Sequence, residues 1–367
     1  MELLKNKISP QFVDEIANSL IGNIEDFDKD AFCKRVCNKL ESLELKDRLL
    51  LITEELYQIF PSDIDTRNAT LKDVICQLDS EGNPLLWGWK VLPFNGVIGQ
   101  HGTLRFEESL NMLKGTTERF SSEFDVRYYL LYDLEKALAI MESWVTDPNH
   151  HVRRLVSEGT RPRLPWAMQL PALIKDPSPI LPLLEKLRDD ESEYVRRSVA
   201  NNLNDISKDH PDLVAAIADQ WIQGADKNRK RLVKHACRTL IKNGHSGAMS
   251  VFGFQLPELD IFRLSVETPR VQFGNNVVFS AILGSEAKNS QLLVIDYVMH
   301  FVKNNGKQSA KVFKWKTVTL KSGETIEISR SHAIKPITTR KYYPGSQGIS
   351  LRINGQDYGN TAFELVM

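Results

Sequence analysis

A helix that begins with two arginines recurs along the middle of the chain, and this repeat constrains the fold more than any other feature. Val152-Arg153-Arg154 returns 43 residues later as Val195-Arg196-Arg197. The apolar positions of the second copy match residues 232–240 after a further 37 positions. One helix pair cannot bury its own apolar face, so units of about 40 residues stack on each other. The pattern predicts a HEAT-like α-helical repeat solenoid.

Helical periodicity extends over the first 255 residues. Apolar residues recur at three- and four-residue steps through 125–144, as on one face of a helix. The aromatic and glycine-rich segment NPLLWGWKVLPFNGVIGQHG, residues 83–102, lacks such a period, and we expect an irregular packed connection there. Further helices are expected at 10–21, 30–43, 45–60, 179–187 and 211–222.

After about residue 256 the pattern changes to short apolar or alternating runs. Gly, Asn, Pro and Ser clusters separate these runs, and Asn304-Asn305-Gly306 and Asn354-Gly355 are turn signals. We therefore expect a C-terminal immunoglobulin-like β-sandwich. The predicted domains are 1–257, helical, and 258–367, sandwich. The expected strands are 263–266, 277–283, 292–302, 311–320, 324–328, 348–353 and 361–366.

Charge is unevenly distributed although the whole chain has a net charge of zero. Residues 147–248 carry 17 Lys and Arg against 13 Asp and Glu, and residues 259–367 carry 14 against 8. The first 146 residues are net acidic. This asymmetry suggests a polyanionic partner for the later regions.

Several classes of protein are disfavoured by composition. No run approaches the ~18 apolar residues of a membrane span, and MELLKNKISP has no signal core, so we expect a cytoplasmic protein without membrane contact. The four cysteines lack the spacing of a zinc site, and we expect free thiols and no metal. No GxGxxG or P-loop pattern is present, and we expect no cofactor.

The segment SEGTRPRLPWA, residues 157–167, ends the first arginine-led helix with an unusual mixture of side chains. Gly159 can end the helix, and two prolines prevent its continuation. Glu158, Arg161 and Arg163 do not suit a core, and a solvated loop does not need Trp166. The mixture favours a partner that is both anionic and flat. The alternative for Trp166 is simple core packing against the next helix.

The cations at the repeated helix starts form a possible ladder for a phosphate backbone. Alternatively they are surface cations paired with Asp147, Asp189 or Asp190. The candidates for DNA contact in this ladder are Arg154, Arg197, Lys230 and Lys234.

Two further acids are candidates for the same site. Glu123 lies in SSEFDVR at a predicted helix start, and Asp205 lies in ANNLNDI late in the next repeat helix. Either could be an ordinary helix acid. A solenoid, however, brings equivalent faces of adjacent helices within ~10 Å of each other.

These residues carry a family resemblance. The sequence resembles the AlkC branch of the AlkC/AlkD family of HEAT-repeat alkylpurine DNA glycosylases. The motifs are SSEFDVR (121–127), HVRRLVSEGTRPRLPWA (151–167), YVRRSVANNLNDISKDHP (194–211) and RKYYPGSQGISLRINGQDYGNTAFEL (340–365). The last of these is similar to the C-terminal immunoglobulin-like domain of that branch.

The resemblance implies a monofunctional DNA glycosylase of base excision repair. Such enzymes hydrolyse the N-glycosidic bond of cationic alkylated bases, N3-methyladenine and N3-methylcytosine, without deep base flipping. It implies catalytic roles for Glu123, Glu158 and Asp205 as carboxylates facing the lesion, and for Trp166 as an aromatic wall. Arg154, Arg161, Arg163 and Arg197 are then expected to hold phosphates, and Arg340 and Lys341 to contact DNA from the sandwich.

The expected partner is double-stranded DNA carrying alkylated bases, bound by a monomer. The competing hypothesis is a non-catalytic HEAT-repeat scaffold that binds DNA or protein, because such repeats most often serve as binding surfaces. A third hypothesis is a hydrolase for another adduct or for a ribosyl bond in RNA.

Overall fold

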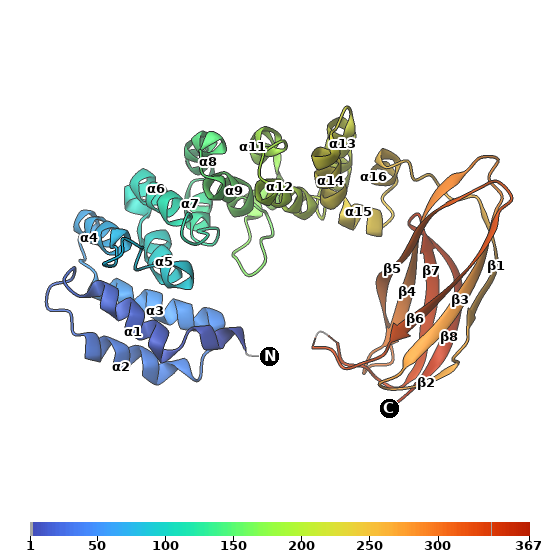
Figure 1. Cartoon of the computed structure of the whole chain (residues 1–367), viewed down its shortest axis with the longest axis horizontal. Helices are drawn as coiled ribbons and strands as arrows, with labels where there is room; N and C mark the ends of the chain where they lie inside the picture. The colour runs from blue at the N-terminus through green and yellow to red at the C-terminus, as the bar shows by residue number, and fades with distance from the viewer. Residues whose placement is uncertain (1–2, 339) are drawn as a thin grey trace. The chain divides into compact units, whose positions relative to one another are not determined.

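The computed structural model describes residues 3–338 and 340–367, without the side chains of Ile261 and Phe262. The chain forms two compact units, Met1–Asp209 with Lys227–Ala236, and His210–Asp226 with Cys237–Met367. We call them the helical unit and the sandwich unit; Figure 1 labels their elements. The domain bounds 1–257 and 258–367 stay a prediction.

The helical unit is built from α-helices joined by short 3-10 turns. Its helices are α1 (Pro10–Leu20), α2 (Lys29–Leu40), α3 (Leu45–Ile59), α4 (Ile64–Cys76), α5 (Leu92–His101), α6 (Phe106–Thr116), α7 (Val126–Tyr132), α8 (Leu134–Glu142), α9 (His150–Gly159), α10 (Pro171–Lys175), α11 (Leu181–Leu187), α12 (Glu193–Ile206) and α14 (Lys227–Ala236). The 3-10 turns are η1 (Leu4–Lys7), η2 (Gly88–Val91), η3 (Thr103–Arg105), η4 (Ser143–Thr146) and η5 (Ser178–Ile180).

The predicted repeat is confirmed by how the arginine-led helices pack. Helix α9 lies against α12, and α12 lies against α14. Helix α11 packs on α9 and α12, so that α8 and α11 form a second row beside them in Figure 1. The matching residues Val152, Val195 and Leu232 are all buried. Burial of such a side chain contributes about 1.5–3 kcal/mol, which explains why the helices stack as a row.

The expectation of an irregular connection at 83–102 is wrong from Gly88 to His101, which form η2 and α5. Every residue from Pro93 to Gly99 is buried, including Asn95. A helix that is apolar on all sides has no amphipathic period, so the usual sequence signal is missing. A Cβ added at Gly99 would lie 3.0 Å from the side chains of Asp125 and Tyr128, so a larger residue would push these neighbours away.

The sandwich unit consists of two β-sheets with three helices. The helices are α13 (Pro211–Ile222), α15 (Arg238–Lys242) and α16 (Ser246–Val251). The strands are β1 (Leu259–Val266), β2 (Arg270–Gln272), β3 (Asn276–Ser285), β4 (Gln291–Val302), β5 (Gln308–Leu320), β6 (Thr325–Ala333), β7 (Gly345–Ile353) and β8 (Gln356–Val366). One sheet has the order β1-β3-β6 and the other β2-β8-β7-β4-β5. All pairs are antiparallel except β2 with β8.

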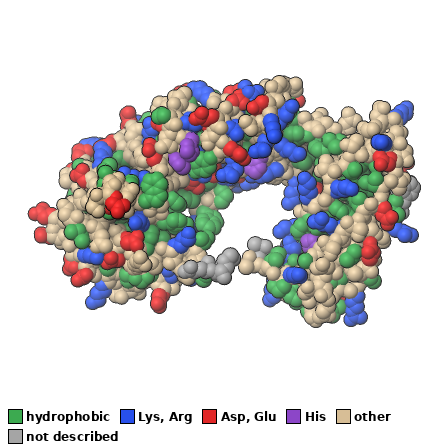
Figure 2. All heavy atoms as spheres, in the orientation of Figure 1, with side chains coloured by type: hydrophobic (Ala, Val, Ile, Leu, Met, Phe, Trp, Pro, Cys, Tyr) green, Lys and Arg blue, Asp and Glu red, His purple; other side chains and the backbone are tan. Residues whose placement is uncertain are grey.

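The predicted immunoglobulin-like sandwich is confirmed, and all seven expected runs lie in strands except for Glu324, which precedes β6. Strand β2 was not expected, because three residues with one buried side chain, Val271, give no period. The predicted Asn354-Gly355 turn joins β7 to β8, and both residues have positive φ, as this two-residue hairpin turn requires. Phe279, Tyr297 and Ile349 lie in the apolar core between the sheets. Figure 2 shows Lys and Arg side chains spread over the visible face of the sandwich, with fewer acids.

A search of the described ranges finds no helix that is both long and apolar enough to cross a bilayer.

Candidate functional site

The loop after α9 turns sharply at a glycine. Gly159 is the last residue of α9, and a Cβ added there would meet Val126 Cγ2 at 2.7 Å, so only glycine lets α9 approach α7 this closely. Pro162 and Pro165 follow and keep the chain out of a helix. The amide of Leu170 donates to the carbonyl of Pro162 at 3.1 Å and closes the loop before α10.

Arg127 on α7 binds the backbone of this loop with three hydrogen bonds. Its side chain is completely buried in α7. Its Nε donates to the carbonyl of Met168 at 2.6 Å, and its Nη1 donates to those of Gly159 and Arg161 at 2.8 and 2.9 Å. Burial and the nearby charge of Arg161 lower the pKa of Arg127 to about 10. One guanidinium therefore fixes both ends of the segment that carries Arg161 and Trp166.

Trp166 is held in the left-handed region of backbone space with its ring in solvent. Its φ is +67°, and its side chain is 62% exposed. Its carbonyl accepts a hydrogen bond from Lys46 Nζ on α3. The alternative prediction of core packing is therefore wrong for Trp166. A bulky residue with positive φ is strained, and such strain clusters at binding sites.

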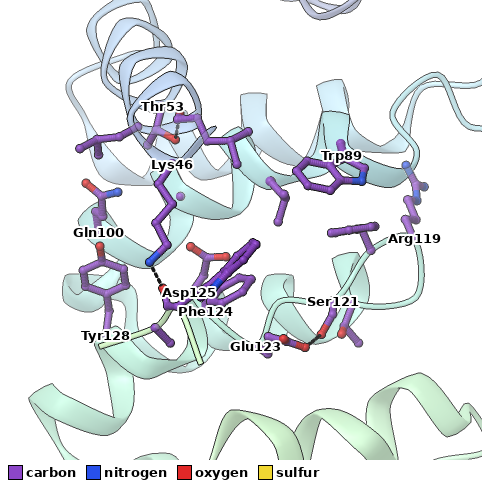
Figure 3. A pocket seen from close by; sticks show the side chains of 18 of the residues that line it. Lys46, Thr53, Trp89, Gln100, Arg119, Ser121, Glu123, Phe124, Asp125 and Tyr128 are labelled. Atoms are coloured by element: carbon purple, nitrogen blue, oxygen red, sulfur yellow. Dashed lines mark hydrogen bonds between the residues drawn. The ribbon is translucent and has the colours of Figure 1, made fainter. Parts of the chain in front are cut away.

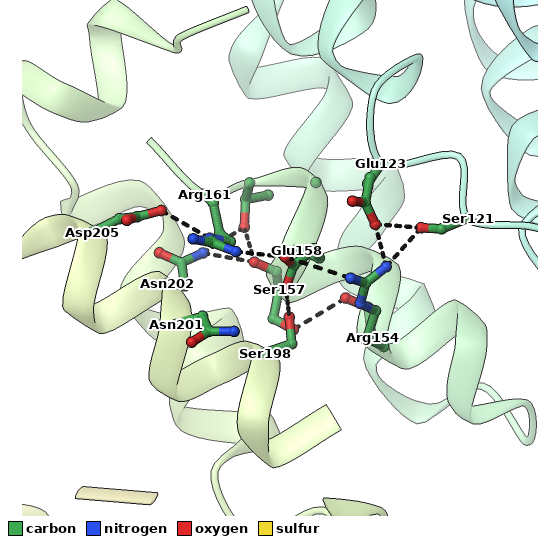
Figure 4. A network of polar contacts seen from close by, with 12 residues as sticks. Ser121, Glu123, Arg154, Ser157, Glu158, Arg161, Ser198, Asn201, Asn202 and Asp205 are labelled. Atoms are coloured by element: carbon green, nitrogen blue, oxygen red, sulfur yellow. Dashed lines mark hydrogen bonds and ion pairs between the residues drawn. The ribbon is translucent and has the colours of Figure 1, made fainter. Parts of the chain in front are cut away.

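Two of the predicted carboxylates share one guanidinium (Figure 4). Arg161 Nη1 donates to Glu158 Oε1 at 2.6 Å, and its Nε donates to Asp205 Oδ2 at 2.8 Å. All three side chains are buried. Burial disfavours the charged guanidinium, but the bonds to Asp205 and Glu158 outweigh it and raise the pKa of Arg161. The α9 loop and α12 are thus joined by a buried ion triad.

A second arginine continues this arrangement toward Glu123. Arg154 Nη2 lies 3.4 Å from Glu158 Oε1, and its Nη1 binds the Glu123 carboxylate. Ser121 Oγ donates to Glu123 Oε2 at 2.7 Å and accepts from Arg154. The Arg154 guanidinium also lies 5.0 Å from the ring centre of Tyr194. The five side chains form one alternating row, Glu123–Arg154–Glu158–Arg161–Asp205, which we call the ion chain.

The ion chain is more buried at Glu158 and Asp205 than at Glu123. Ser198 Oγ donates to Glu158 Oε2 at 2.6 Å, and Lys208 Nζ lies 2.7 Å from Asp205 Oδ1. The side chains of Glu158 and Asp205 are 6% and 2% exposed, against 15% for Glu123. Glu123 is therefore the carboxylate of the chain with the most access to solvent.

Glu123 also lines a cavity of about 660 Å³, shown in Figure 3. Trp166 and Arg154 contribute to the same wall. The aromatic residues of the lining are Trp87, Trp89, Phe120, Phe124, Tyr128, Trp166 and Tyr194. The structure thus brings the predicted aromatic wall and one end of the ion chain to a single opening.

The remaining predicted cations lie outside the ion chain. Arg163 forms a two-pronged ion pair with Asp209 at 2.7 Å. Arg197 is exposed in a small groove between α12 and α14, and Lys230 and Lys234 are exposed on α14. In the sandwich unit, Arg340 lies 3.9 Å from the ring centre of Phe301, and Lys341 is exposed. Their contacts with DNA stay predictions.

Two other cations of the repeated helix starts, Arg153 and Arg229, are paired with acids as in the alternative, but the pair of Arg153 is buried and not on the surface. Arg153 binds Asp190 with both prongs, at 2.6 and 3.0 Å. Arg229 Nε donates to Asp189 at 2.6 Å. These two arginines tie their helices to the loop before α12.

Sequence reasoning missed Arg127, Ser198 and Asp125 as members of the site. Arg127 is a charged residue at a buried position of its helix, and such residues are rarely buried without a specific partner. Ser198 lies four residues after Tyr194, on the same face of α12. Asp125 stands in the quoted SSEFDVR motif, but only the structure shows that it is buried in the cavity wall. Within the described ranges, no group of three His, Cys, Asp or Glu residues is placed to hold a metal ion.

Comparisons with known proteins agree with this architecture. The model of the DNA alkylation repair enzyme family matches residues 124–243, and the model of the C-terminal Ig-like domain of uncharacterised protein YhaZ matches 260–367. The chain is 37% identical to uncharacterized protein YhaZ of Bacillus subtilis (strain 168), over 99% of each sequence. It is also similar to the structure of Pseudomonas fluorescens alkylpurine DNA glycosylase AlkC bound to DNA containing an abasic site analog.

That similarity has a TM-score of 0.88 and 34% identity over 100% of both chains. The first family match includes α9 and α12, the two helices that carry most of the ion chain. The second covers nearly all of the strands. The chain therefore belongs to the DNA alkylation repair enzymes, in the AlkC branch that adds an immunoglobulin-like domain to the helical repeats.

Proposed function

We propose that this protein is a monofunctional DNA glycosylase that hydrolyses the N-glycosidic bond of cationic alkylated bases, N3-methyladenine and N3-methylcytosine. The observation that carries the proposal is the ion chain, which ends at Glu123 on the cavity that Trp166 also lines. The AlkC structure supports it, because an abasic sugar is what remains after a base has been removed.

The reaction does not require a general acid to protonate the leaving base. A base alkylated at N3 is already positive, so the bond electrons leave with it and the released base is neutral. Water adds to C1′ of the sugar and gives up one proton. We assign this proton to Glu123, because it is the carboxylate of the ion chain that lines the cavity.

Glu158 and Asp205 then act by their charge. The sugar becomes positive as the bond breaks, and fixed carboxylates stabilise positive charge that develops in the transition state. Arg161 holds both carboxylates in place with hydrogen bonds of 2.6 and 2.8 Å, and Arg154 forms an ion pair with Glu158 at 3.4 Å. Because the carboxylates are preorganised, little reorganisation is needed when the charge appears.

Trp166 supplies selectivity for a cationic base. Its exposed indole presents a flat face with a negative quadrupole, and attraction of a cation to such a face is worth about 0.5–2 kcal/mol. A neutral, unmodified base would gain less. The strained backbone of Trp166 keeps the ring exposed toward an incoming base, although this strain lowers local stability.

Double-stranded DNA is the proposed substrate, bound by a monomer. The exposed cations Arg197, Lys230, Lys234 and Lys341 are the proposed phosphate contacts, with Arg163 and Arg340. Each phosphate contact releases counterions, so the logarithm of the affinity falls by about 0.9 per contact for each tenfold increase in salt. Phosphate contacts by Arg154 and Arg161 would have to share guanidinium groups that already bind carboxylates.

Incubation with methylated duplex DNA tests the proposal. Bases released into solution are separated by HPLC, and DNA binding is followed in parallel across a salt series. A glycosylase releases N3-methyladenine and binds DNA with a steep salt dependence. Salt-dependent binding with no released base would leave the non-catalytic scaffold as the function, and no DNA binding would point to a protein partner.

A further inference from the structure

Two acidic side chains of the cavity wall lie outside the ion chain, the exposed Glu118 and the buried Asp125. Asp125 precedes α7 and is only 7% exposed. Within residues 3–338 and 340–367, its carboxyl has no hydrogen-bond or ion-pair partner, whereas Glu123 in the same wall binds Ser121 and Arg154. Asp125 lines the cavity and is labelled in Figure 3. A carboxyl on a cavity wall without a protein partner is free to pair with a molecule that enters the cavity.

The cations of the wall have other partners. Lys46 donates to the carbonyl of Trp166, and Arg119 donates to the carbonyl of Ile75. Burial and the negative charge of Glu123 raise the pKa of Asp125 to about 8. The Asp125 carboxyl is therefore protonated at neutral pH and presents one O–H donor and one carbonyl acceptor side by side.

The rest of the wall suits a flat aromatic molecule. Trp87 and Trp166 are more than half exposed. Together with Trp89 they line the cavity, whose wall also includes residues of α3, α5 and the loop before α7. His151 on the wall has a pKa lowered by burial and by the charges of His150 and Arg154, so it adds no charge at neutral pH. A volume of about 660 Å³ lies within the range of small-molecule sites.

We propose that this cavity binds the free N-alkylated adenine base that the enzyme has released, with its ring against the tryptophans and its amino edge on the Asp125 carboxyl. An adenine edge offers an exocyclic amino donor beside a ring-nitrogen acceptor, which is the complement of a protonated carboxyl. The proposal rests on the proposed function for the source of the base. Because the base enters after the bond is broken, no flipping of an intact nucleotide is required.

Binding is measured by calorimetric titration of the full chain with free 3-methyladenine. Three variants are compared: Asp125→Ala, Asp125→Asn, and the control Glu135→Ala on the exposed side of α8. Wild type and Glu135→Ala are expected to bind equally, and Asp125→Ala at least tenfold more weakly. Asp125→Asn is expected to recover part of the loss, because an amide can also pair with an adenine edge. Trp87→Ala, an exposed wall change, is expected to weaken binding severalfold.

The proposal is overturned if wild type shows no heat of binding, or if Asp125→Ala binds as well as wild type while both melt at the same temperature. It is also overturned if thymine, which lacks the amino edge, binds as tightly as 3-methyladenine. Base release from methylated DNA is measured separately with wild type. Release without binding of the free base removes this inference and leaves the glycosylase, whereas binding without release removes the glycosylase and leaves the site.

Discussion

Arg161 binds the carboxylate of Asp205, 44 residues further along the chain, at 2.8 Å in a buried environment. The same guanidinium binds Glu158, three residues before it. One side chain of the loop after α9 thus decides where two carboxylates from neighbouring repeats lie. This places the loop at the centre of both the stability and the proposed chemistry of the helical unit.

Replacing Arg161 with alanine is expected to destabilise the helical unit strongly. Two buried carboxylates would lose their shared partner, and breaking a buried pair typically costs about 3–5 kcal/mol. The measurement is urea unfolding followed by circular dichroism. Arg161→Lys keeps the positive charge but loses the forked donor geometry of the guanidinium, so its stability should lie between those of wild type and Arg161→Ala. Wild-type stability of Arg161→Ala would mean that the ion triad is not formed in solution.

Arg127 is expected to act as a positioning residue for the same loop. Arg127→Met leaves the carbonyls of Gly159, Arg161 and Met168 without their donor while filling much of the same space. The expected result is a lower rate of base release with a faster proteolytic cut in residues 160–169. Arg127→Lys should restore part of both properties. A slower rate with an unchanged proteolytic pattern would argue against a role in holding the loop.

Trp166 separates stability from activity. Trp166→Gly removes the strain of positive φ, whereas Trp166→Ala keeps it, so the glycine variant should be more stable than the alanine variant by about 1 kcal/mol. Both lose the indole and should release cationic bases more slowly. Thermal melting and base release of the two variants provide the check. If alanine proved the more stable of the two, the left-handed conformation of this residue would be refuted.

The stability of the helical unit should fall as pH rises through neutrality because of Asp125. Its pKa is about 8 in the folded chain, raised by burial and by Glu123, and ~3.9 in the unfolded chain. The folded state therefore keeps a proton that the unfolded state loses, so this stabilisation is complete below pH ~4 and is lost as pH rises to 8 and above.

Asp125→Asn stays neutral and should escape this loss. The difference in melting temperature between Asp125→Asn and wild type is expected to rise by a few °C from pH 5 to pH 8. Each pH unit between the two pKa values lowers the stability of wild type by up to about 1.4 kcal/mol, and water in the cavity reduces this loss. Differential scanning fluorimetry at four pH values suffices. Glu135→Gln, an exposed matched change, should show a constant difference. A constant difference for Asp125→Asn as well would contradict the raised pKa.

Much of this fold could be predicted because its patterns are periodic. The arginine-led repeat located α9, α12 and α14, and the apolar runs located all strands except β2. Helix α5 could not be predicted from amphipathicity, because Phe94, Asn95 and Val97 are all buried. A helix surrounded by protein carries no polar face to reveal its period.

The site could be predicted only in part. Glu158, Arg161 and Trp166 stand in one short segment, and their joint function is suggested by composition alone. The joining of Glu158 to Asp205 through Arg161 depends on the packing of α9 against α12, which spacing does not reveal. The position of Asp125 on the cavity depends on wall segments that are far apart in the sequence, so no local sequence pattern reveals it.

The central claim is that Glu123, at the open end of the ion chain, serves the removal of a cationic base. Its most direct test is single-turnover release of N3-methyladenine from methylated duplex DNA, measured by HPLC for wild type, Glu123→Gln and the exposed control Glu135→Gln. The account predicts release by wild type and Glu135→Gln, and a rate lower by a factor of about 100 or more for Glu123→Gln, with DNA binding retained. Wild-type release by Glu123→Gln, or no release by wild type bound to the same DNA, would contradict it.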